Sequence, residues 1–167
     1  MMLATIVLVC AALATHPEPA VQKAAAPGAR PPSPQDAAML VALLQVHLSE
    51  PILKARRFYR NELTEGMSLS EFESRFARGS EGFEHFLNLM TFWETVGSLI
   101  QRGLVNEDLA FDTFLDAPPW KKVARIFKER RERDKAPLMA EHFEWVAGRA
   151  AEWIARHEAE SRQQKKP

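Results

Sequence analysis

The clearest helical pattern in the chain lies between Glu81 and Arg102. At about 100° per residue, nearly all of this segment is apolar except for one narrow polar stripe. The stripe consists of Glu84, Asn88, Thr91, Thr95, Ser98 and Arg102. A helix that is apolar over most of its circumference is buried among its neighbours. The pattern therefore predicts a central helix over 81–102, which Gly103 ends.

Helical periodicity recurs on both sides of this segment, and capping residues and prolines mark its limits. For example, Ser68 and Glu71 have the spacing of a capping box. No run alternates apolar and polar residues around a hairpin turn, so we expect no strand. The sequence predicts an all-α fold, an irregular helical bundle of about six or seven helices around the central apolar helix. The other helices are expected at about 36–48, 52–63, 68–79, 106–114, 116–136 and 138–160.

The two ends of the chain differ from this domain. Residues 3–14 are uncharged and apolar apart from Thr5, and as a helix these twelve residues would span only about 18 Å of a membrane core of about 30 Å. Residues 15–35 are rich in Pro and Ala, and such a chain favours an extended spacer. We divide the chain into an apolar signal-like or anchor segment (1–14), a Pro/Ala-rich linker (15–35), a helical domain (36–161) and a polar tail (162–167).

The apolar segment bears on where the protein acts. Its length matches the apolar region of a signal peptide, and Ala12-Leu13-Ala14 has the form of a cleavage site, although no Lys or Arg precedes it. We expect a protein of the bacterial cell envelope, tethered to the inner membrane or exported. The alternative is a cytoplasmic protein with a frayed apolar terminus.

Composition and motifs narrow the function classes. Lys+Arg and Asp+Glu both number 22, so no whole-protein basic field favours nucleic acid. The one cysteine, Cys10, excludes an internal disulfide and a Cys-rich metal site. None of His85, His142 and His157 has the Glu three positions earlier that a di-iron bundle uses. With no nucleophile elbow or phosphate-binding glycine loop, we expect no catalytic residue, cofactor, metal or specific nucleic-acid partner.

Two charged residues fall on apolar arcs of predicted helices, Glu94 on 81–102 and Arg56 on 52–63. A buried charge is costly unless it is paired, and arginine suits a carboxylate partner. We therefore predict that Arg56 and Glu94 form a structural buried ion pair. The alternative is a small enzyme with an unrecognised site near Glu94 and His85.

Two surfaces are candidates for binding. The stretch 121–135 holds eight Lys and Arg against three acidic residues, so Lys121, Lys122 and Arg125 are candidate contacts to an anionic surface. Four i,i+4 pairs favour instead an ion-paired, solvated helix face: Arg125–Glu129, Lys128–Glu132, Glu129–Arg133 and Arg130–Asp134. On the last helix, Trp145 lies off the apolar spine with Arg149 nearby, and the two mark a possible protein-interaction surface.

A set of short blocks carries a family resemblance. The blocks are Leu87–Gly97 (LNLMTFWETVG), Arg102–Val105 (RGLV) and Glu107–Leu109 (EDL), flanked by Ala55–Tyr59 (ARRFY) and His142–Val146 (HFEWV). Over roughly residues 50–149 the chain resembles the bacterial domain of unknown function 4760 family. Many of its members look like a short membrane anchor followed by a helical domain, so the resemblance implies tethering through the N-terminus. It implies no activity, and no catalytic residue is carried over.

The expected function follows from these observations. We expect a non-enzymatic helical module that binds an unknown protein partner, as a monomer or weak dimer, with possible membrane association through residues 3–14. An enzyme with a site near Glu94 and His85, or an anionic-surface binder using the basic helix 121–135, remains the alternative.

Overall fold

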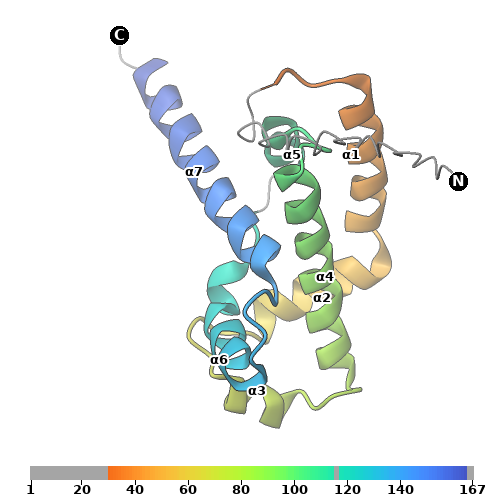
Figure 1. The fold of residues 1–167 in the computed structure, drawn as a ribbon, viewed down its shortest axis with the longest axis vertical. Helices are drawn as coiled ribbons and strands as arrows, with labels where there is room; N and C mark the ends of the chain where they lie inside the picture. Colours follow the sequence, from red (N-terminus) through yellow and green to blue (C-terminus); the bar gives the residue numbers. More distant parts are fainter. Residues whose placement is uncertain (1–29, 115–116, 165–167) are drawn as a thin grey trace, which may run out of the picture.

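The computed structural model describes residues 30–114 and 117–164. Over these residues the chain folds into seven α-helices and one short 3-10 helix, and no strand occurs among them (Figure 1). The all-α prediction is confirmed. The elements are α1 (Pro34–His47), α2 (Glu50–Asn61), α3 (Leu69–Arg75), α4 (Glu81–Gln101), α5 (Glu107–Phe114), η1 (Trp120–Lys122), α6 (Ala124–Asp134) and α7 (Glu141–Gln164).

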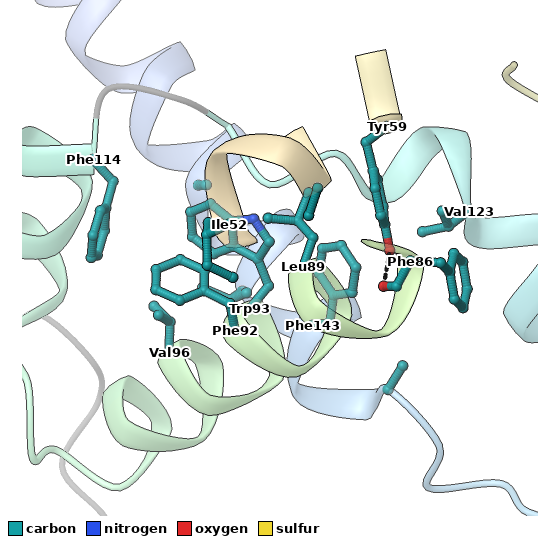
Figure 2. Packing of buried hydrophobic residues seen from close by; sticks show 14 of the residues in the cluster. Ile52, Tyr59, Phe86, Leu89, Phe92, Trp93, Val96, Phe114, Val123 and Phe143 are labelled. Atoms are coloured by element: carbon teal, nitrogen blue, oxygen red, sulfur yellow. Dashed lines mark hydrogen bonds between the residues drawn. The ribbon is translucent and has the colours of Figure 1, made fainter. Parts of the chain in front are cut away.

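Helix α4 is the central element of the bundle and packs against both α2 and α7 (Figure 1). Its polar stripe faces outwards, with Glu84, Thr91 and Thr95 exposed to solvent. Its other sides carry the core. Figure 2 shows buried side chains gathered around this helix from several elements, including Tyr59, Phe86, Leu89, Trp93, Phe114 and Phe143.

The crossing of α4 and α7 depends on a glycine. A Cβ atom placed on Gly97 would lie 2.2 Å from the carbonyl oxygen of His142, well inside van der Waals contact. Only a residue without a side chain allows the two backbones to approach this closely. Gly97 therefore sets how closely the last helix packs against the central one.

Three helix boundaries differ from the predicted ones for identifiable reasons. Helix α1 starts at Pro34 because Ser33 is its N-cap and forms a capping box with Asp36. Helix α6 starts only at Ala124, because Pro118 and Pro119 cannot continue a helix and η1 intervenes. Between α6 and α7, Lys135 (φ 51°) and Ala140 (φ 57°) adopt left-handed conformations that interrupt the helical path.

In the described part of the chain, no single helix is both long and apolar enough to cross a membrane. Helices α1 and α2 reach that length and apolarity only when they are counted together, and their axes are bent by 66°. The apolar segment 3–14 lies outside the described residues.

Candidate functional site

Glu94 has a different partner from the one predicted. Its carboxylate accepts a hydrogen bond of 2.9 Å from the backbone N–H of Phe143, in the first turn of α7. A carboxylate at this position satisfies an N–H that has no partner within its own helix and interacts favourably with the helix dipole. Glu94 is therefore a cap that α4 supplies to α7.

The predicted Arg56–Glu94 ion pair is not among the ion pairs of residues 30–114 and 117–164, and the rotation of α4 explains why. Trp93 lies one residue and about 100° away from Glu94 on the same helix, and it lines a pocket together with Arg56. Glu94 is turned towards α7. The pKa of Arg56 lies below its usual range because the side chain is partly desolvated and the charge of Arg60 is nearby.

Glu94 and His85, the two residues of the alternative enzyme site, do not lie together in the structure. His85 and Glu94 are nine positions apart on α4, which places them about 180° apart around the helix. His85 lies beside the ring of Phe58 in α2, with ring centroids 5.9 Å apart, whereas Glu94 contacts α7. In the described ranges, no group of three or more His, Cys, Asp or Glu side chains is placed to hold a metal ion.

The basic residues after Pro119 are largely engaged within the fold. Lys122 Nζ donates to the carbonyl oxygens of Tyr59 (2.9 Å) and Arg60 (2.7 Å), which caps the end of α2. Arg125 pairs with Glu129 at 2.6 Å and also donates to the carbonyl of Gly66. Of the surface candidates in this stretch, Lys121 and Arg125 are exposed to solvent, whereas Lys122 is half-buried.

The predicted pairing along α6 is found in part. Arg125–Glu129 and Arg130–Asp134 form as expected. Arg133, however, bonds to Glu73 of α3 at 2.8 Å and to the adjacent Asp134 at 2.7 Å, instead of to Glu129. Glu129 also accepts from the N–H of Leu69, at the start of α3. The charges of α6 therefore serve to attach α3.

The Trp145–Arg149 surface is more buried than the sequence suggested. Trp145 is half-buried and packs against the core. Arg149 forms a two-point ion pair with Glu107 of α5, with N–O distances of 3.0 and 2.7 Å, and Glu107 is only 2% exposed. Arg149 thus joins α5 to α7, which leaves little of this pair for an outside partner.

Sequence reasoning missed a buried junction at the start of α1. Asp36 is fully buried, and its carboxylate accepts from the guanidinium of Arg30 (2.6 and 2.5 Å), the N–H of Ser33 (2.7 Å) and the N–H of Asn106 (2.8 Å). Arg30 also donates to the carbonyl of Gly103, and its own carbonyl accepts from the Asn106 side chain. These bonds hold the pKa of Asp36 well below its usual range. Part of the predicted linker, from Arg30 onwards, is therefore attached to the domain.

A second feature was also missed, the outer face of α1, which we define by Met39, Val41, Val46 and the C-cap residue Leu48. These side chains are 39%, 56%, 50% and 57% exposed. The spaces between them are filled by Ala38, Ala42 and Gln45, all exposed as well. The carboxylate of α1 is Asp36, which points inwards. The available signal was that α1 is almost entirely uncharged, which is typical of a helix buried on all sides.

The comparison with known proteins places this fold in a family. The model of the domain of unknown function 4760 (DUF4760) matches residues 24–150. The chain belongs to this family. The matched region of DUF4760 includes Arg30 and the Asp36 junction, and it ends within α7. A search of curated proteins gave no match, and neither did a search of solved structures.

Proposed function

We propose that this DUF4760 protein is a non-enzymatic helical module that binds an uncharged, apolar helix of a protein partner through the outer face of α1. Residues 3–14 hold the module at the bacterial inner membrane or direct its export. The observation that carries the proposal is the exposure of Met39, Val41, Val46 and Leu48 on one charge-free face. Contiguous exposed apolar side chains mark binding surfaces.

The chemistry of the partner follows from the charge of this face. A charged partner surface would lose its hydration here without gaining a counter-charge, which is costly. An apolar helix loses nothing of this kind and gains roughly 25 cal/mol for each Å² of apolar surface buried. The face therefore favours an uncharged helix laid along α1.

The small size of the face connects it to the N-terminal segment. Helix α1 has 14 residues, or about 21 Å of length. One face of so short a helix offers less area than the roughly 800 Å² that each partner buries in a stable interface. Contact through α1 alone would be weak. Holding both proteins at one membrane raises their effective concentration and makes a weak contact sufficient. This supports a tethered module over a freely diffusing one.

Photocrosslinking of the full chain in the cells that produce it tests this proposal. A photoreactive residue replaces Val41 or Val46 in one set of chains, and the exposed Lys128 of α6 in the control. We expect both α1 positions, and not Lys128, to crosslink to one partner, within an uncharged apolar helix. Ala42→Glu should abolish the crosslinks, and the purified partner should rebuild the complex.

Other occupants of the face would contradict the proposal. Crosslinks to a second copy of the chain would make α1 a homodimer interface. Crosslinks to residues 3–14 of the same chain would make that segment the cover of α1. Equal crosslinking from Lys128 would show that α1 has no special role.

A further inference from the structure

A pocket of about 220 Å³ is lined by residues of α1, α2, α4 and the segment that leads to α6. Its apolar walls are formed by Tyr59, Leu89 and Trp93, each no more than 2% exposed. Figure 2 shows Leu89 and Trp93 on α4 and Tyr59 on α2, where the Tyr59 hydroxyl donates to the carbonyl of Phe86. Because that hydroxyl is already bonded, Tyr59 offers the pocket mainly its ring.

Three cationic side chains line the same pocket nearer to solvent. Arg60 is exposed, and Arg56 and Lys122 are half-buried. The ammonium of Lys122 is held in place by its two bonds to the end of α2, and an ammonium has a third proton to donate. The repulsion between Arg56 and Arg60 contributes to the lowered pKa of Arg56.

His47 also lines the pocket, and it carries an unsatisfied polar atom. Its side chain is buried, at 4% exposure, between the rings of Phe92 and Phe114, whose centroids are each 5.1 Å from its own. Its Nδ1 atom has no hydrogen-bond partner. Leaving such an atom unpaired costs about 1–3 kcal/mol. A bound ligand, or a water molecule held by it, would offer the missing bond.

We propose that this pocket binds a small organic carboxylate, with its anionic group at Arg60 and Lys122 and its apolar body between Tyr59, Leu89 and Trp93. The volume is below the roughly 300–1,000 Å³ of pockets for drug-sized ligands, so the ligand is about as large as benzoate. Inorganic phosphate would satisfy the cations but leave the apolar walls without a partner. The site is separate from the outer face of α1.

A titration of the full chain with sodium benzoate at constant ionic strength tests the site. The readouts are the indole N–H of Trp93 and the ring of His47 in ¹H–¹⁵N spectra. We expect saturable shifts at both, with a Kd of roughly millimolar order, as suits a ligand of this size. Arg60→Gln should weaken binding at least five-fold. The matched control, Arg57→Gln, changes an exposed arginine of the same helix outside the pocket and should leave the Kd unchanged.

Three outcomes would overturn the inference: shifts that do not saturate, equal weakening by Arg57→Gln and Arg60→Gln, or phosphate binding as tight as benzoate with the same shifts. Ala42→Glu, which disrupts the proposed docking face, should leave benzoate binding intact. The two proposals therefore succeed or fail separately.

Discussion

The two faces of α1 differ in how completely the fold accounts for them. The inner face, Asp36, Leu40, Leu43 and His47, is buried, and Asp36 alone bonds to three other residues. The outer face carries apolar side chains of similar size that have half or more of their surface exposed at Val41, Val46 and Leu48. Both faces are part of one nearly uncharged helix, so composition does not distinguish them. Their contacts do distinguish them, because the inner face is buried within the fold and the outer face is exposed to solvent.

The largest expected effect is at the inner face. Asp36→Ala removes a buried carboxylate and leaves the N–H groups of Ser33 and Asn106 without their acceptor. We expect a loss of roughly 3 kcal/mol in the free energy of unfolding, measured by urea denaturation. Val41→Ala on the outer face is the control and should stay within about 0.5 kcal/mol of the parent. Equal losses would remove the distinction between the two faces.

The inner face should also make stability depend on pH. Burial, and to a lesser degree the charge of Arg56, lowers the pKa of His47 from 6.5 to about 4. Between these values the unfolded chain binds a proton that the folded chain does not, so stability falls as pH falls from 6.5 towards 4. The contribution of His47 over this window is about 3 kcal/mol.

Urea melts at pH 7 and pH 4.5 would measure this dependence. In His47→Gln the drop in unfolding free energy between the two pH values should be smaller by most of that amount. An unchanged drop would mean that His47 titrates normally and is not desolvated. The pKa of Asp36, also lowered, acts only below the usual range of an aspartate and does not contribute to this window.

Gly97 and Gly148 differ in the same way as the two faces of α1, because a side chain would meet neighbouring atoms at Gly97 and open space at Gly148. Gly97→Ala places a Cβ against the backbone of His142, where the neighbour cannot move away as a flexible side chain would. We expect a loss of about 1–3 kcal/mol. Gly148→Ala on α7 meets no atom within 4 Å and should stabilise the domain by roughly 0.5–1 kcal/mol. Thermal or urea denaturation of both variants would show whether α4 and α7 approach as closely as described.

A smaller change in the free energy of unfolding is expected at Glu94, and it distinguishes a helix cap from the predicted ion pair with Arg56. Glu94→Ala removes a helix cap and should cost about 1 kcal/mol, and Glu94→Gln, which keeps an acceptor for the N–H of Phe143, should cost less. A double-mutant cycle with Arg56→Met should give a coupling energy near zero, since the Glu94 carboxylate bonds to the backbone of α7. A coupling energy of several kcal/mol would instead show that Arg56 and Glu94 form the predicted ion pair.

The helices could be predicted because their signals are local. The 3.6-residue period of 81–102, the cap at Asn106, whose side chain accepts from Leu109, and the left-handed Gly103 all involve neighbours along the chain. The same period also separates Glu94 from His85, nine residues away on the opposite side of the helix.

The partners of the charged residues could not be predicted, because they come from distant parts of the chain. Asp36 meets Asn106 across 70 positions, and Glu94 meets Phe143 across 49. Helix amphipathicity shows that a position is buried but does not show which element covers it. The outer face of α1 is the converse case, because its apolar composition is typical of a buried helix and the fold leaves it exposed.

The most direct test of the account is the accessibility of Val41 in the purified chain and in the cell. The one native cysteine, Cys10, is replaced by serine, and Val41→Cys and Lys128→Cys are then labelled with a maleimide. We expect both thiols to react at the rate of an exposed thiol in the purified full chain, with or without lipid vesicles. In the cell, Val41→Cys should react at least ten-fold more slowly, and Lys128→Cys should not slow. Equal labelling of the two positions in the cell, or protection of Val41→Cys already in the purified chain, would contradict the claim that a protein partner covers α1.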